Sequence, residues 1–120
     1  MMEASARARY VRIPPRKLRL VGDIVRGKGV EEALRMLPFV QRRGSKVLLK
    51  TLQSAISNLA SKKQNLRVEA ENLYIKEVKV DEGPRLKRFR AASMGRVALI
   101  KHRLSHLTVV VAEHKEGGEA

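Results

Sequence analysis

A run of positive charge separates two segments near the end of the chain that both have the composition of β-strands. Residues 84–106 contain seven lysine and arginine residues and no acidic residue. The flanking segments, Leu73–Asp81 and Leu107–Glu113, are alternating or rich in β-branched residues. We therefore expect a long basic β-hairpin over residues 83–106, which we call the arm. Because few of its residues are apolar, we expect a polyanion to surround and order it.

Small and turn-forming residues near the middle of the arm define its expected tip. The tip residues are Ala91, Ala92, Ser93, Met94 and Gly95. A helix over Gly95–Leu104 is the alternative, because Val97, Ile100 and Leu104 recur at nearly helical spacing. We favour a pair of strands, since the segment joins two predicted strands.

The N-terminal segment Ala4–Ile13 has the alternation of a β-strand, and two consecutive prolines end it. Ala4, Ala6, Ala8 and Tyr10 should share one side of this strand. That side is only weakly apolar, which is typical of a strand at the edge of a sheet.

Three helices are predicted between this strand and Leu73. They cover Pro15–Arg26, Val30–Leu37 and Arg43–Lys63. The first helix should bury a face formed by Leu18, Val21 and Val25. The third helix should form the centre of the core through its stripe of Leu48, Leu52, Ala55, Ile56 and Leu59.

The strand Leu73–Asp81 should place Tyr74, Val78 and Val80 on one face, and the Gly-Pro pair after it should break or bend it. The order of elements is then β-α-α-α-β-arm-β. This order predicts an α+β fold, with three helices packed on a small antiparallel three-stranded sheet and a long basic β-hairpin extension. We expect one domain over residues 1–113, followed by a polar tail at 114–120.

The composition limits the kinds of partner that the chain can bind. Its 120 residues carry a formal net charge of +14, and phosphate backbones are the commonest counter-charge for such an excess. Aromatic residues make up only 3%, so phosphate and shape contacts should outweigh base stacking. The chain has no cysteine, no apolar run approaching the ~18 residues of a membrane span, and no apolar signal core. We therefore expect a cytoplasmic protein without membrane contact.

Two basic clusters are the candidate nucleic-acid-binding sites. The N-terminal cluster consists of Arg7, Arg9, Arg12, Arg16, Lys17 and Arg19. The arm supplies Arg85, Lys87, Arg88, Arg90, Arg96, Lys101, His102, Arg103 and His106. Arginine suits bidentate phosphate contacts, and a helix that begins at Pro15 offers free N–H groups to an anion. Ordinary surface charge is the alternative for the N-terminal cluster.

The sequence gives little support for a metal site, a cofactor or catalysis. On a strand, His102 and His106 would be about 13 Å apart, too far for one ion. Ser105 and His106 face opposite sides of a strand, so a triad with Asp81 is not expected. We predict a protein that is not an enzyme, in which His106 packs or forms a hydrogen bond.

Several segments together resemble the large-subunit ribosomal protein of the L-twenty-two family in its bacterial-type form. They are YVRIPPRKLRLV at Tyr10–Val21, RGK at Arg26–Lys28, LQSAISN at Leu52–Asn58, LYIK at Leu73–Lys76, VDEGPRLKR at Val80–Arg88 and RLSHLTV at Arg103–Val109. The resemblance spans roughly residues 5–113. The chain departs from the family at the tip, which lacks the customary proline and two arginines. It also carries Pro14 in place of a serine and Leu104 in place of a threonine.

The resemblance implies a structural constituent of the large ribosomal subunit that binds 23S-type rRNA and stabilises its fold during assembly. It also implies that the tip of the arm lines the nascent-chain exit tunnel. The implied partners are large-subunit rRNA, neighbouring ribosomal proteins and the nascent polypeptide, and no stable homo-oligomer is expected. The alternative is an architectural DNA-binding protein with a basic β-arm in the minor groove.

Overall fold

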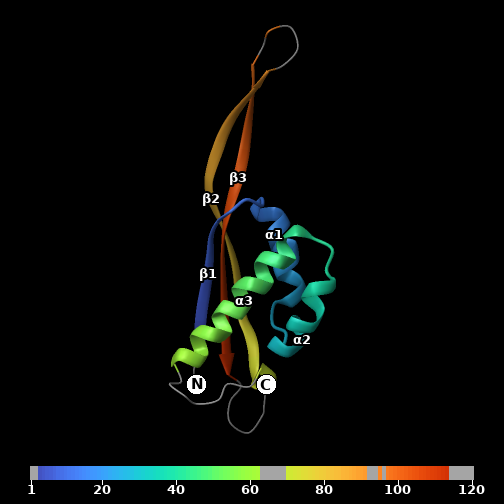
Figure 1. Cartoon of the computed structure of the whole chain (residues 1–120), viewed down its shortest axis with the longest axis vertical. Helices are drawn as coiled ribbons and strands as arrows, with labels where there is room; N and C mark the ends of the chain where they lie inside the picture. Colours follow the sequence, from blue (N-terminus) through green and yellow to red (C-terminus); the bar gives the residue numbers. More distant parts are fainter. Residues whose placement is uncertain (1–2, 63–69, 92–94, 96, 114–120) are drawn as a thin grey trace.

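The computed structural model describes residues 3–62, 70–91, 95 and 97–113 (Figure 1). It contains three strands, three α-helices and two short 3₁₀ helices. In chain order these are β1 (Glu3–Val11), α1 (Pro15–Val25), α2 (Val30–Met36), η1 (Leu37–Phe39), α3 (Arg43–Lys62), η2 (Ala70–Asn72), β2 (Leu73–Ala91) and β3 (Val97–Glu113). The predicted α+β order is confirmed.

The sheet is antiparallel with the order β1-β3-β2, so β3 is the central strand. Ala6 lies opposite Val109, and Val80 lies opposite Leu107 on the other side of β3. The helices lie on one side of the sheet, with α3 packed along β1 and β3 and α1 packed against β2 (Figure 1). The prediction that β1 is an edge strand is confirmed.

The core lies between α3 and the central strand. Leu107, Val109 and Val111 alternate along β3 and are fully buried, as are Leu52 and Leu59 of α3. Each such side chain contributes about 1.5–3 kcal/mol of burial free energy. The small side chains of β1 that face α3 let the long helix lie close to the sheet, because no bulky side chain separates the two elements.

Helix α1 begins at Pro15 as predicted, and its N-cap residue Pro14 makes no side-chain hydrogen bond. Its predicted face is buried against the sheet and α3. Gly44 lies where the two helices cross. A Cβ atom at Gly44 would lie 3.0 Å from Leu18 Cδ1 and 3.2 Å from Val21 Cγ2, so a larger residue here would require these side chains to shift.

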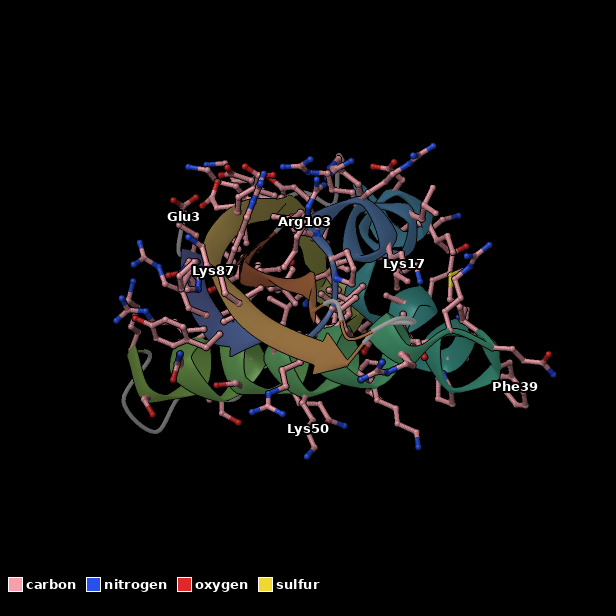
Figure 2. The ribbon with its side chains drawn as sticks, turned by 90° about the horizontal axis from the view of Figure 1, so that it is seen from above. Glu3, Lys17, Phe39, Lys50, Lys87 and Arg103 are labelled. Atoms are coloured by element: carbon pink, nitrogen blue, oxygen red, sulfur yellow. The ribbon has the colours of Figure 1, made fainter. Side chains whose placement is uncertain are left out.

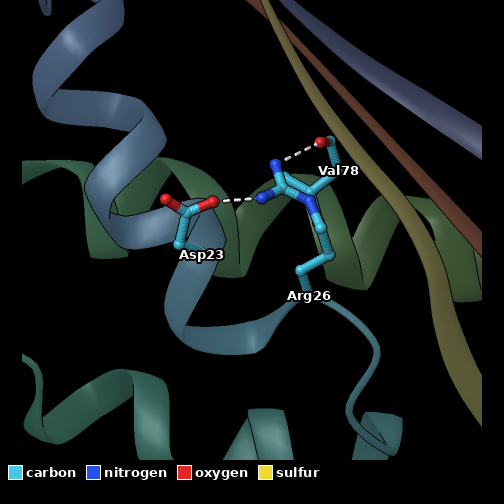
Figure 3. A network of polar contacts seen from close by, with 3 residues as sticks. All are labelled: Asp23, Arg26 and Val78. Carbon is cyan, nitrogen blue, oxygen red and sulfur yellow. Dashed lines mark hydrogen bonds and ion pairs between the residues drawn. The ribbon is translucent and has the colours of Figure 1, made fainter.

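Side chains from the helices cover both edges of the sheet. Arg26 Nη2 donates to the Val78 carbonyl (2.7 Å) and also pairs with Asp23, as Figure 3 shows. Arg19 Nη2 donates to the Val80 carbonyl at 3.0 Å. On the opposite edge, Asn58 Nδ2 and Lys62 Nζ of α3 donate to β1 carbonyls, each at 2.8 Å. Covered edges disfavour strand pairing with another chain.

Two residues differ from their predicted faces because the strands contain bulges. A register shift between Ile75 and Glu77 places one extra residue in β2, so Leu73 and Ile75 enter the core and Tyr74 does not share the face of Val78 and Val80. The prediction for Tyr74 is wrong for that reason. A second shift, between Ala8 and Val11 in β1, turns Tyr10 away from the alanine side. The Tyr10 ring is 56% exposed, so its predicted face is wrong as well.

The arm is a pair of strands. β2 and β3 stay paired as far as Ala91 opposite Val97, so the helical alternative for this segment is wrong. The Gly-Pro pair coincides with a register shift between Glu82 and Arg85, which interrupts the pairing without ending the strand. The molecule is 69 Å long but only 26 and 18 Å across, because the arm projects beyond the helices (Figure 1).

The burial pattern predicts that the helices and the base of the sheet fold without the projecting part of the arm. We expect that replacing residues 85–103 with a two-residue turn leaves one cooperative unfolding transition and shifts the melting temperature by only a few degrees. Leu104 and Ser105, which are buried, are retained in this variant. The reference for a damaged core is Leu52→Ala, which should cost about 2–5 kcal/mol of unfolding free energy. Loss of cooperative unfolding in the shortened chain would contradict this prediction.

Candidate nucleic-acid interface

Cations face one another across the arm. The register of β2 and β3 places Arg85 opposite Arg103 and Lys87 opposite Lys101. The side chains of Arg85, Lys87 and Arg103 are exposed, and Figure 2 shows Lys87 and Arg103 in a view along the arm. Like charges directly opposite each other destabilise a strand pair. The hairpin therefore repels itself unless anions lie between or around these side chains.

For other predicted arm residues the structure describes less. Arg88, Arg90, Ala91, Lys101 and His102 are described only as backbone within β2 and β3. Of the remaining tip and arm residues, Gly95 is exposed, while residues 92–94 and 96 lie outside the described residues. Their predicted contacts stay predictions.

The base of the arm is fixed by two hydrogen bonds, one to the end of β1 and one to the segment after it. Ser105 is fully buried, and its Oγ donates to the Ile13 carbonyl at 2.5 Å. The Tyr10 N–H donates to His106 Nδ1 at 3.1 Å, which confirms the prediction that His106 forms a hydrogen bond. A Cβ atom at Gly83 would lie 3.3 Å from His106 Nε2 and from the Leu104 backbone, so glycine allows the strands to stay close here. Ser105 is therefore a structural residue at the base of the arm.

All six members of the N-terminal cluster are exposed, and one of them also has a structural contact. Arg7, Arg9, Arg12, Arg16 and Lys17 are exposed, and Arg7 and Arg9 share the side of β1 opposite Ala4 and Ala6, as predicted. Arg19 is exposed too, but it also donates to a β2 carbonyl. Arg19 thus contributes to the α1–β2 contact as well as to surface charge.

The structure reveals a groove that sequence reasoning missed. It lies between residues 11–13, the η1 turn and the start of α3, and it has a volume of about 790 Å³. Its cations are Arg12, Arg42, Arg43 and Lys46. A second hollow shares Arg42 and Arg43 and adds Arg16 and Lys17. We call the two together the basic groove; none of the described residues that line it is acidic.

Three of the six cations in the basic groove come from the start of α3. Arg43 is the first residue of this helix, Lys46 lies in its first turn, and the first turn has no acidic residue. Cations are unfavourable at this end because the helix dipole is positive there. Basic residues without an acidic residue in the first turn of a helix can be recognised in the sequence alone. Because they do not stabilise the helix, we infer that these charges serve binding.

Three carboxylates of the body form ion pairs with cations of the body. Asp23 pairs with Arg26, and Glu32 Oε1 lies 3.5 Å from Lys28 Nζ. Lys76 Nζ donates to Glu3 Oε2 at 2.6 Å; this hydrogen bond lowers the pKa of the Glu3 carboxyl and raises the pKa of Lys76. None of these three pairs uses a cation of the basic groove, Arg85 or Arg103.

The described residues form neither a candidate metal site nor a membrane-spanning helix. No three His, Asp or Glu side chains among them form a group that could hold a metal ion. None of the helices they form is both long and apolar enough to cross a membrane.

A basic surface of this kind suits a ribosomal protein and an architectural DNA-binding protein alike, and comparison with known proteins decides between them. Residues 6–112 match the family model described as Ribosomal protein L22p/L17e. The chain belongs to this family. It is 48% identical over 117 residues to the large ribosomal subunit protein uL22 of Desulfitobacterium hafniense (strain Y51), covering 98% of this chain and all of that protein. It is 49% identical over 116 residues to the uL22 of Carboxydothermus hydrogenoformans (strain ATCC BAA-161 / DSM 6008 / Z-2901), covering 97% and 100%.

A third relative agrees with the first two. The uL22 of Halothermothrix orenii (strain H 168 / OCM 544 / DSM 9562) is 47% identical over 116 residues, which cover 97% of this chain and all of that protein. The resemblance seen in the sequence is therefore confirmed, as is the prediction that the chain is not an enzyme. Membership in a family of ribosomal proteins also disfavours the architectural DNA-binding alternative.

The basic groove gives a prediction that separates specific contacts from general charge. The double variant Arg42→Ser/Lys46→Ser should bind large-subunit rRNA about tenfold or more weakly, because two charge-assisted phosphate contacts are removed. The control Arg35→Ser/Lys50→Ser removes the same charge from exposed positions outside the groove, and Lys50 points away from the sheet (Figure 2). Filter binding at fixed salt measures both variants. Equal losses in the two variants would mean that the groove makes no specific contact.

Proposed function

We propose that this chain is a structural component of the large ribosomal subunit in the cytoplasm and that it binds and organises 23S-type rRNA. The names of its relatives support membership of that subunit. The observation that carries rRNA binding is the pairing of cations across the projecting arm, beginning at Arg85 and Arg103. Like charges at opposed positions weaken a strand pair, and phosphates close to the arm would remove this repulsion.

The body and the arm would contact different parts of the rRNA. The paired part of the arm, Arg85–Ala91 with Val97–Arg103, extends over roughly 20 Å at the usual rise of a strand. The basic groove and the exposed N-terminal arginines lie on the body, at the other end of this span. Neutralising phosphates at both places would hold separate rRNA segments together and release their counterions. This is how the protein would stabilise the rRNA fold during assembly.

The tip of the arm, residues 91–95, would line the nascent polypeptide exit tunnel. The support is the family resemblance together with the length and projection of the arm. Residues 1–113 would act as one unit that carries this extension, and residues 114–120 as a polar tail. Neighbouring ribosomal proteins and the nascent chain are the proposed protein partners. Because helix side chains cover both edges of the sheet, we expect no stable homo-oligomer.

The salt dependence of binding tests this function. The affinity for large-subunit rRNA should fall steeply with salt, with a log–log slope on the order of 5 or more, because several phosphates are neutralised together. Duplex DNA of equal nucleotide concentration should compete poorly, since a B-form duplex does not offer separate segments to body and arm. A flat salt response would contradict the electrostatic mechanism, and equal competition by DNA would favour the architectural alternative.

A further inference from the structure

Tyr10 has an unusual backbone conformation. Its φ angle is +56°, and no other non-glycine residue among those described has a positive φ. The left-handed region is unfavourable for an aromatic residue, and residues held there often serve a function. The conformation occurs at the register shift of β1, where a regular strand would have continued the side of Ala4 and Ala6.

The consequence of this conformation is an exposed aromatic ring. A regular strand would have turned Tyr10 toward the helices, where Ala4 and Ala6 are buried. Instead the ring is 56% exposed, so the fold gives up its burial as well as an unstrained backbone. The hydrogen bond from the Tyr10 backbone to His106 is a structural gain of this conformation, whereas the ring itself loses burial in the core.

The exposed ring is held in place rather than left free. The Tyr10 N–H donates to His106 Nδ1, and the two rings meet edge to face with centroids 5.0 Å apart and planes 86° apart. His106 belongs to β3 at the base of the arm. The Arg9 guanidinium carbon lies 5.7 Å from the centroid of the Tyr10 ring, so a planar group already approaches this ring.

We propose that Tyr10 is a stacking platform for one unpaired nucleobase of the rRNA. The proposal rests on the rRNA binding proposed above. Any base can stack on an aromatic ring, and a ring fixed before binding loses little entropy. The exposed Arg9, whose guanidinium lies over the ring, and the exposed Arg12, two residues after Tyr10 in the chain, can bind the phosphates of the stacked nucleotide. This cationic surrounding favours a nucleotide over a protein partner, for which apolar neighbours would be expected.

Two variants separate the ring from the backbone. Tyr10→Gly removes the ring and suits a positive φ, whereas Tyr10→Phe keeps the ring. We expect Tyr10→Gly to bind large-subunit rRNA about tenfold more weakly, with an unchanged salt slope, because stacking neutralises no phosphate. Its melting temperature should not fall, since glycine relieves the backbone strain. Tyr10→Phe should bind within about twofold of the original chain.

A direct readout uses the other tyrosine of the chain as an internal control. Ultraviolet irradiation of the complex with large-subunit rRNA, followed by mass spectrometry of the peptides, should find a nucleotide attached to Tyr10 and none on Tyr74. Unchanged affinity of Tyr10→Gly would overturn the platform while leaving rRNA binding intact. If affinity and melting temperature fall together, Tyr10 has a folding role. If the affinity for rRNA is unchanged but a neighbouring ribosomal protein no longer binds, Tyr10 makes a protein contact. Either result overturns the proposal. If the original chain fails to bind rRNA, the proposed function itself is wrong.

Discussion

Repulsion between cations that face each other across the arm is the constraint on which the structure depends. Arg85 and Arg103 are exposed and directly opposed, and the next outward basic pair follows the same register. Backbone hydrogen bonds hold the two strands together, but they do not remove this repulsion. The proposed rRNA would do so, and the arm projects from the body into a position that such a partner can surround. The positive charge of the arm therefore suits the chain to a complex with a polyanion.

The body uses some of its cations for folding and leaves others for binding. Arg19, Arg26 and Lys62 donate to strand carbonyls at the two edges of the sheet. Arg42 and Arg43 instead lie at the start of α3, where they oppose the helix dipole and line the basic groove. The net charge alone does not distinguish these two roles, because only tertiary structure shows which guanidinium groups have partners in the protein.

Local patterns in the sequence predicted the elements well. The apolar stripe around Leu52, the proline start of α1 and the β-branched segment at 107–111 each depend on neighbouring residues alone. The bulges that move Tyr10 and Tyr74 could not be predicted, because one extra residue leaves an alternating pattern nearly as regular as before. The basic groove was missed because it joins segments about 30 residues apart in the chain, and packing rather than sequence brings them together.

Amide hydrogen exchange along the arm tests the central claim most directly. In the free protein at low salt, the amides of Arg85–Ala91 and Val97–Arg103 should exchange at least about a hundredfold faster than those of Leu107–Val111, because opposed cations weaken the pairing of the arm while the central strand lies in the core. Binding to large-subunit rRNA should slow exchange in the arm toward the rate of the central strand. Equal protection of arm and central strand in the free protein would show that the hairpin needs no polyanion, and it would contradict this account.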